Sequence, residues 1–446
     1  MIDRRPLPTA ELVALSLPTL VFAGYDLARR SFLAIYLSGD LKLSVGAVGW
    51  LVMLASLTSI PAEVLAGALG DYGLQRLGRR SQWIVLGTII LAVSGVILLR
   101  ADRSTSTLVV ALTLIAFITG WALCNVAQGA WALEITSDPV ARTRIFGWRS
   151  FAGIAGGIGF SAIGAIQLHQ SGPSFLTIMI PAIAGAGLAH GFLVTRVQDS
   201  RPVPVPWKSD RLTAPLRLIF ANRANSQLAV LFALNGAHTA ITTTSYLYVV
   251  GFGLALPGWG PSGILVQSIC AAIGVMATIR FGSRMPAADL LRIVLLANLL
   301  LAVVMIALPP RSPDQLMAWS AGFGLFSVVD FMALRIMLGE RLDFHNREAA
   351  DAVPAAAHYA GFHLPFNLCG AVAGGVLFLG YTALGFEPNM AQTPEQLFAP
   401  VILMPALSAI LAMVLSLWIL AIFRHELHKE AGECRRPGVD LCDPIN

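Results

Sequence analysis

Long apolar stretches recur along this chain of 446 residues, separated by shorter polar segments. Twelve of them reach or approach the roughly 20 residues that an α-helix needs to cross the apolar core of a bilayer. They lie at approximately 11–37, 44–69, 83–100, 108–133, 149–168, 175–196, 226–252, 260–280, 291–309, 316–338, 354–384 and 399–423. Because lipid offers the backbone no hydrogen bonds, each stretch is expected to be helical. The pattern therefore predicts an all-α integral membrane protein with twelve transmembrane helices.

The longest polar interruption divides the chain near its middle. Six apolar stretches precede this Pro-rich, basic segment and six follow it. We predict an N-terminal six-helix bundle at 1–196, a cytoplasmic linker at 197–225, a C-terminal bundle at 226–424 and a polar tail at 425–446. Two six-helix halves joined by a linker fit the major facilitator fold, in which substrate binds between the halves near the middle of the membrane.

Composition and charge agree with a membrane location. Hydrophobic residues make up 56% of the chain and charged residues only 12%, about half the charged fraction of a soluble domain. With the N-terminus inside, 23 of the 30 Lys and Arg residues fall in cytoplasmic segments and four fall outside. This bias predicts an inner-membrane protein with both termini in the cytoplasm. The net charge of +5 then reflects topology and gives no reason to expect nucleic-acid binding.

Two cytoplasmic segments resemble known families. "GALGDYGLQRLGRRSQW" (67–83) resembles the major facilitator signature of a Gly, an Asp and paired basic residues. "WALEITSDPVARTRIFGWRSF" (131–151) is similar to the glycoside–pentoside–hexuronide:cation symporters, the group that contains melibiose permease. The matching positions are Glu134, Thr136, Asp138, Arg142, Thr143 and Arg149. This resemblance implies transport of a sugar or glycoside together with a coupling cation.

Three charged residues lie in the first apolar stretch. Asp26, Arg29 and Arg30 are spaced i, i+3 and i+4, so they share one helix face. A charge at mid-bilayer costs about 2.5–3.5 kcal/mol unless it is paired or faces water. The group is either an internal salt bridge or part of a substrate cavity. In a cavity, two cations around one anion would favour an anionic solute, and the family resemblance implies a sugar-binding aspartate near Asp26.

Glu63 is the one carboxylate inside the second stretch, with Ser59 one turn before it. A hard cation such as sodium needs several oxygen ligands, and the resembled sodium-coupled transporters use two aspartates there. A single carboxyl in apolar surroundings is better suited to binding a proton. We therefore predict that Glu63, or Asp26, loads a coupling proton and that sodium is less suited to this role. The alternative is a protonated Glu63 that only joins two helices.

Polar residues on other stretches complete the candidate set. Each has a structural alternative, either joining helices or, for Arg149, anchoring the cytoplasmic end of its helix. Candidate substrate-binding residues are Asn125, Gln128 and Trp131 on the fourth stretch, Arg149 on the fifth, and His363 and Asn367 on the eleventh. Where sugar-transporting relatives carry an aspartate on the fourth helix, this chain has Ala127. Asn235, His238 and Thr242 form a polar stripe on the seventh stretch, and Asp330 and Arg335 lie on the tenth.

The sequence shows no constellation typical of an enzyme. It contains no phosphate-binding glycine loop, no convincing metal-ligand cluster and no recognisable nucleophile with its base, so we expect neither a cofactor nor a metal. The favoured function is proton-coupled symport of a sugar, glycoside or related, possibly anionic, solute by alternating access. The alternatives are a drug or lipid exporter of the same fold, or a membrane sensor or assembly protein that does not transport. The sequence leaves open the identity of the solute and the direction of transport.

Overall fold

A computed structural model describes residues 8–77, 81–134, 139–166, 175–197, 219–220, 222–281, 285–348, 355–390 and 392–434. The N-terminal half contains α1 (Thr9–Leu27) with its continuations η1 (Ala28–Phe32), α2 (Leu33–Ile35) and η2 (Tyr36–Asp40), then α3 (Val45–Leu77), α4 (Ser81–Arg100), α5 (Thr107–Glu134), α6 (Pro139–Ile166) and α7 (Phe175–Arg196). The C-terminal half contains α9 (Arg223–Tyr248) with η5 (Val249–Gly253), α10 (Gly260–Phe281), α11 (Ala287–Ile306), α12 (Pro313–Ser327), α13 (Val329–Glu348), α14 (Ala355–Ala383), α15 (Pro394–Leu397), η7 (Phe398–Leu403) and α16 (Met404–Cys434). No strand occurs among the described residues.

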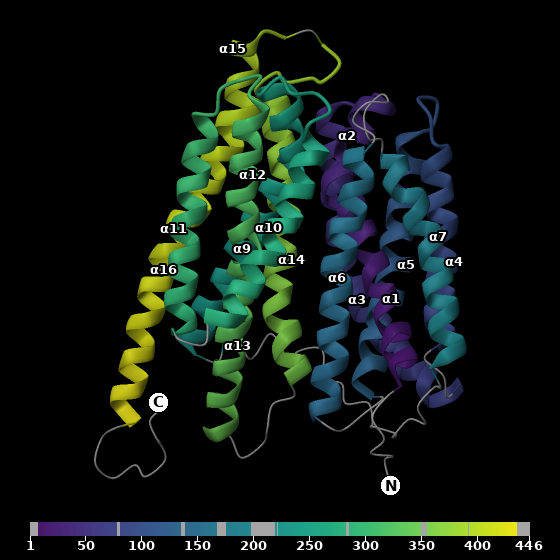
Figure 1. The fold of residues 1–446 in the computed structure, drawn as a ribbon, viewed down its shortest axis with the longest axis vertical. Helices are drawn as coiled ribbons and strands as arrows, with labels where there is room; N and C mark the ends of the chain where they lie inside the picture. The colour runs from purple at the N-terminus through teal and green to yellow at the C-terminus, as the bar shows by residue number, and fades with distance from the viewer. Residues whose placement is uncertain are drawn as a thin grey trace.

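The predicted all-α fold of twelve membrane helices in two bundles is confirmed (Figure 1). Within the described residues, eleven helical stretches are long and apolar enough to span a bilayer. The remaining predicted span is α9 with η5. Its mean hydropathy is too low to place it among those eleven, because it carries polar residues such as Asn235, His238 and Thr242.

Two helices differ from their predicted bounds. The tenth span is broken, since α12 ends at Ser327 and α13 begins at Val329. The last helix continues to Cys434, past residue 424 where the bundle was expected to end. Most of the predicted linker lies outside the described residues.

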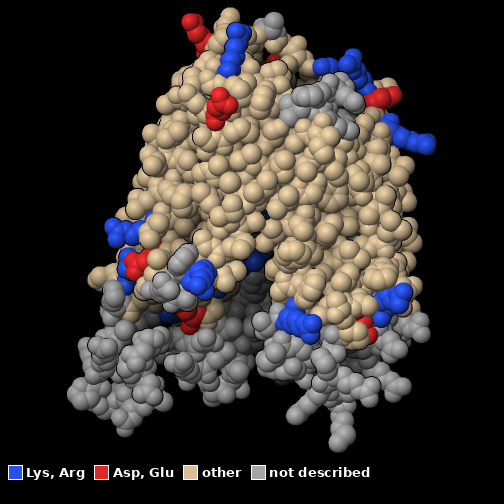
Figure 2. Space-filling model, in the orientation of Figure 1, with Lys and Arg blue, Asp and Glu red and all other residues tan. Residues whose placement is uncertain are grey.

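The two halves pack closely at the end of the molecule that carries α15, the upper end in Figure 1. One apolar cluster there joins residues of both halves, including Leu37 and Val45 with Tyr248 and Phe378. Near the opposite end, each half has a separate cluster, one around Trp131 and the other around Phe232. The shared core therefore holds the halves together at the upper end only, and Figure 2 shows a hollow between them at the lower end.

Polar contacts reinforce the closed upper end. The hydroxyls of Ser38 and Tyr248, one from each half, lie 2.7 Å apart in buried surroundings. Asn389 donates to the Ser38 carbonyl at 3.1 Å, and Lys42 donates to the Asn389 side chain at 2.5 Å. These bonds connect the end of the first span to the seventh span and to the segment before α15.

Helices α3 and α14 approach each other closely at this end because both present glycine. A Cβ added to Gly49 would lie 2.7 Å from the Phe378 Cβ and 3.1 Å from the Gly375 carbonyl oxygen. Neither neighbour is the movable tip of a side chain. The contact between the halves is therefore incompatible with a larger residue at Gly49.

We expect Gly49→Leu to shift the protein toward a state that is open at the upper end. A cysteine introduced at Ser56, in a background without native cysteines, should then react faster with a thiol reagent added from that side. Gly187→Leu is the matched control, because a Cβ there meets nothing within 4 Å. Equal labelling rates in the two variants would show that this helix contact does not control opening.

The surface agrees with a position across a bilayer. Charged residues gather at the two ends of the face in Figure 2, and the middle band is uncharged. Large apolar side chains such as Phe151, Leu188 and Trp418 are exposed. Such a band would be unfavourable in water and matches the apolar core of a membrane.

Candidate functional site

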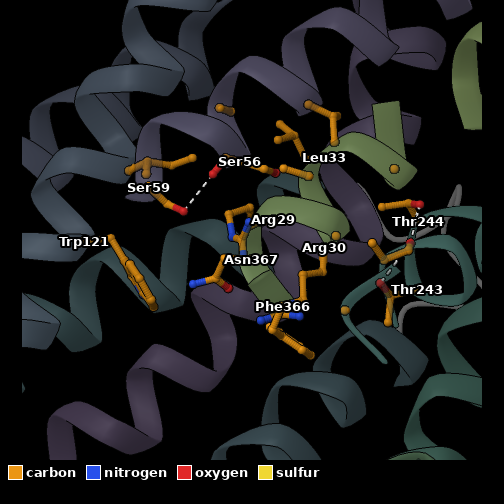
Figure 3. Close-up of a pocket in the computed structure, with 18 of the residues that line it drawn as sticks. Arg29, Arg30, Leu33, Ser56, Ser59, Trp121, Thr243, Thr244, Phe366 and Asn367 are labelled. Atoms are coloured by element: carbon orange, nitrogen blue, oxygen red, sulfur yellow. Dashed lines mark hydrogen bonds between the residues drawn. The ribbon is translucent and has the colours of Figure 1, made fainter. Parts of the chain in front are cut away.

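A cavity of about 140 Å³ lies between the two halves (Figure 3). Its wall comes from the first span, α3 and α5 on one side and from α9 and α14 on the other. Pockets for drug-sized ligands are larger, roughly 300–1,000 Å³, so this one suits a small solute. Its polar and aromatic lining residues are Tyr25, Arg29, Arg30, Ser56, Ser59, Glu63, Phe117, Trp121, Thr243, Thr244, His363, Phe366 and Asn367.

The charged group of the first span lies at this cavity. Arg29 and Arg30 line it, and Figure 3 shows both side chains reaching into it. They belong to the π-helical segment Ala28–Phe32, a wider turn that occurs often at functional sites. All three charged side chains remain partly exposed, at 37% for Asp26, 26% for Arg29 and 36% for Arg30. The salt bridge and the cavity wall, which the sequence left as alternatives, therefore occur together: Arg29 and Arg30 line the cavity, whereas Asp26, which pairs with both, is not among its lining residues.

Asp26 contacts both arginines. Arg29 Nη2 donates to Asp26 Oδ1 at 3.0 Å, and Arg30 Nε lies 2.8 Å from Oδ2. The three groups carry a formal net charge of +1. A guanidinium has five N–H donors, so both arginines keep donors for a ligand.

Glu63 faces the same cavity from α3 and is half-buried. Ser56 and Ser59 lie on the same face, and the Ser59 hydroxyl donates to the Ser56 carbonyl at 2.7 Å (Figure 3). Glu63 and Arg29 are close enough to interact electrostatically. No group of three or more potential metal-binding side chains occurs among the described residues.

The C-terminal half contributes polar groups that face the arginines. On α14, Asn367 Nδ2 lies 3.1 Å from His363 Nδ1, and both side chains line the cavity. On α9, Thr243 and Thr244 line it, with hydroxyls that donate to carbonyls of their own helix. Those hydroxyl oxygens can still accept hydrogen bonds. The cavity thus combines cationic donors on one half with neutral polar groups on the other.

Two candidate residues on the fourth span do not reach the cavity. Gln128 is fully buried, and its Nε2 donates to the Leu15 carbonyl at 2.9 Å. Trp131 is 1% exposed and packs in an apolar cluster with Leu12 and Leu15. The prediction that they line the cavity is wrong, because the first turns of α1 cover this part of α5.

Asn125 and Arg149 are also not among the residues that line the cavity. Asn125 is half-buried, one turn along α5 from Trp121. Arg149 is partly buried on α6, and its Nε donates to the Thr19 hydroxyl of α1 at 3.3 Å. Arg149 therefore connects α6 to α1.

Sequence reasoning missed the aromatic residues that do line the cavity. Trp121, ten residues before Trp131, supplies the aromatic surface of α5. Tyr25 lies directly before Asp26, is 1% exposed, and its hydroxyl finds no partner among the described residues. Helical spacing could have identified Tyr25 from the sequence, because Tyr25 and Arg29 are four residues apart and share a helix face.

The polar stripe on α9 is turned away from the cavity. Gly236, Ala240, Thr243 and Thr244 face the cavity, whereas Asn235 and His238 are each only 3% exposed within the C-terminal half. Asn235 and His238 therefore pack inside their own half. Several motif positions have side chains outside the described residues, namely Asp71, Arg79, Arg80, Glu134, Thr136, Asp138, Arg142, Thr143 and Tyr359.

Comparison with known proteins identifies the family. A family model described as MFS/sugar transport protein matches residues 15–424. The chain belongs to this family. It is an integral membrane transporter with a small-molecule substrate, and not an enzyme. No curated protein sequence matches it.

Solved transporters share the fold at low sequence identity. The nucleoside transporter NupG is 14% identical, with a TM-score of 0.67, over 94% of this chain and 99% of NupG. A bacterial homolog of the human lysosomal transporter Spinster is 18% identical, with a TM-score of 0.65, over 99% of this chain and all of the other. A D-xylose–proton symporter is 14% identical, with a TM-score of 0.65, over 92% of this chain and 97% of the other. These likenesses show the fold of the chain and leave its substrate open.

Proposed function

We propose that this transporter is a proton-coupled symporter of a sugar, glycoside or related solute, acidic sugars included. The observation that carries the proposal is the small cavity between the halves, where Arg29 and Arg30 face neutral hydrogen-bonding groups of α14. Hydroxyl-rich solutes need many donors and acceptors, and a carboxylate is best held by guanidinium. The similarity to sugar symporters of the glycoside–pentoside–hexuronide group supports the same class.

The proposed mechanism is alternating access between the two halves. The structure is closed at the upper end by the Ser38–Tyr248 contact and by the close packing of α3 on α14. If the termini are cytoplasmic, this state releases solute inward. Rocking the halves would break the upper contacts and expose the cavity to the other side. Glu63 would take up the coupling proton, because neutralising it removes a carboxylate that competes with solute for Arg29.

The proposal is tested by uptake into proteoliposomes across a panel of neutral sugars, uronides, small organic anions and apolar compounds. We expect an imposed inward proton gradient to drive accumulation of a hydrophilic solute above its external concentration. A protonophore should abolish this accumulation, and a sodium gradient should not replace the proton gradient. Export of apolar compounds alone would favour the drug or lipid exporter, and no transport of any compound would favour the non-transporting alternative.

The proposed orientation in the inner membrane has its own test. A protease site inserted near Pro204, in the predicted linker, should be cleaved in inverted membrane vesicles and protected in intact spheroplasts. The expectation rests on the bias of 23 inside against four outside basic residues. Cleavage only from the periplasmic side would show that the linker lies in the periplasm. The open lower end of this structure would then face the periplasm as well.

A further inference from the structure

A second group of polar side chains is buried behind the cavity wall in the C-terminal half. Its central member is Asp330, the second residue of α13, directly after the break between α12 and α13. Asp330 is 1% exposed. Its Oδ1 accepts from the Phe331 N–H at 2.6 Å, and its Oδ2 has no hydrogen-bond partner. Buried polar atoms are normally hydrogen-bonded, so this carboxyl oxygen calls for a physical explanation.

Polar side chains of α9 also lack hydrogen-bond partners. Asn235 lies within reach of the carboxyl, yet neither polar atom of its amide forms a hydrogen bond. His238 lies one turn further along α9, and both of its ring nitrogens lack partners. A protonated Asp330 would supply the donor that the Asn235 carbonyl oxygen lacks. An ionised Asp330 could instead accept from the Asn235 amide, so the same neighbour can serve both states.

The charges around Asp330 leave both protonation states accessible. Among the described residues, no ion pair of Asp330 is found. No charged side chain of the helices packed against α13, such as Arg280 of α10 or Asp289 and Arg292 of α11, interacts electrostatically with Asp330 within the described part of the chain. Arg335, on the same helix as Asp330, lies over the Phe331 ring at 4.2 Å. Burial disfavours the ionised carboxylate of Asp330. Its position at the N-terminus of α13 favours the same ionised form through the helix dipole.

A short path of contacts connects this group to the cavity. The ring of Phe331, next to Asp330, packs on Phe366 with ring centres 4.9 Å apart and on His363 at 5.8 Å. Both of those residues line the cavity, as does Gly236, which follows Asn235. Asp330 is therefore one layer of side chains behind the wall, in the half opposite Glu63.

We propose that Asp330 is a second proton-binding site, in which Asn235 accepts a hydrogen bond from the protonated carboxyl and donates one to the ionised carboxylate. Its role in coupling rests on the proposed transport function, whereas the protonation itself does not. Charging Asp330 would disturb the packing of Phe331 on the cavity wall, which gives the C-terminal half a way to respond to the proton.

The test is an infrared titration of the purified full-length protein between about pH 5 and pH 8, the range in which physiological switches operate. The wild-type protein should lose the signal of a protonated carboxyl as pH rises. Asp330→Asn should lack, over the whole range, the component of this signal that belongs to Asp330. Two controls should keep it, namely Glu63→Gln and Asp289→Asn, the latter being the same substitution in a peripheral ion pair with Arg424. A titrating signal in Asp330→Asn that equals that of the wild-type protein, so that no component is specific to Asp330, would overturn the proposal.

A second variant covers the case in which Asp330→Asn does not fold. Asp330→Glu keeps a titratable carboxyl but alters its geometry, so the signal assigned to Asp330 should shift in frequency and midpoint. An unchanged spectrum would also overturn the proposal. This titration and the uptake panel can fail separately. If no solute is transported, the titration of Asp330 can still be observed. If Asp330 does not titrate, proton-coupled uptake through Glu63 remains possible.

Discussion

Arg30→Gln should reduce the affinity for an acidic solute by about 10- to 150-fold, the loss expected when one hydrogen bond to a charged group worth about 1.5–3 kcal/mol is removed. Arg30 is 36% exposed and lines the cavity, and its guanidinium has donors beyond the Nε that contacts Asp26. Glutamine keeps a donor but removes the positive charge and the planar fork that binds a carboxylate in two places. Binding isotherms for a uronide and for its uncharged parent sugar would measure the effect.

Charge dependence distinguishes this role from a purely structural one. The neutral sugar should lose much less affinity than the uronide, and Arg30→Lys should restore part of the uronide affinity because lysine keeps the charge. Equal losses for both solutes, or full activity in a folded Arg29→Gln/Arg30→Gln double variant, would show that the arginines serve only the structure.

Asp26→Asn is the matching substitution at the carboxylate of the ion pair. Asp26→Asn leaves two partly buried cations without their carboxylate, and we expect a loss of about 1–3 kcal/mol in unfolding free energy, the range for unsatisfied buried groups. The side chains face the cavity rather than a dry core, so this value lies below the 3–5 kcal/mol of a fully buried pair. Arg30→Gln should destabilise the protein less, because Asp26 retains its bond with Arg29.

Glu63→Gln should abolish accumulation of solute against its gradient while leaving exchange of solute across the membrane. The substitution keeps the size and polarity of the side chain and removes its ability to gain and lose a proton. Glu63 is half-buried at the cavity and interacts with Arg29, so its charge is well placed to compete with an anionic solute. Uphill uptake driven by a proton gradient and counterflow without a gradient would be measured in the same proteoliposomes.

The two measurements separate coupling from binding. Ser59→Ala is the control, since it changes the same face of α3 without touching a titratable group. Unchanged uphill uptake in Glu63→Gln would remove Glu63 from the coupling mechanism. Uptake stimulated by sodium and insensitive to pH in the unmodified protein would show that other oxygens complete a cation site beside Glu63.

Much of the fold could be predicted from the sequence because the membrane imposes it. A helix is the simplest element that satisfies its own backbone in lipid, so apolar length alone indicated twelve spans. The α9 span was found although its polar residues keep it below the hydropathy of the others. The break at Val328 was not predicted, because the sequence there has no proline or glycine that would announce it.

The site was only partly predictable because helix periodicity fixes which residues share a face but not which neighbour covers that face. Of the candidate residues, Arg29, Arg30, Glu63, His363 and Asn367 line the cavity, whereas Asp26 does not. Gln128 and Trp131 lie on a helix that does line the cavity, but α1 crosses over their part of it. Likewise, Asn235 and His238 face the interior of their own half, while Thr243 and Thr244 face the cavity.

The most direct test of the central claim follows solute and protons together. Purified protein in proteoliposomes, loaded with a pH-sensitive dye and given no initial ion gradient, would receive a transported solute from outside. The proposed symport predicts that the lumen acidifies as solute enters, with both movements absent from protein-free liposomes. Entry of solute at the same rate with no change in lumenal pH would contradict proton coupling.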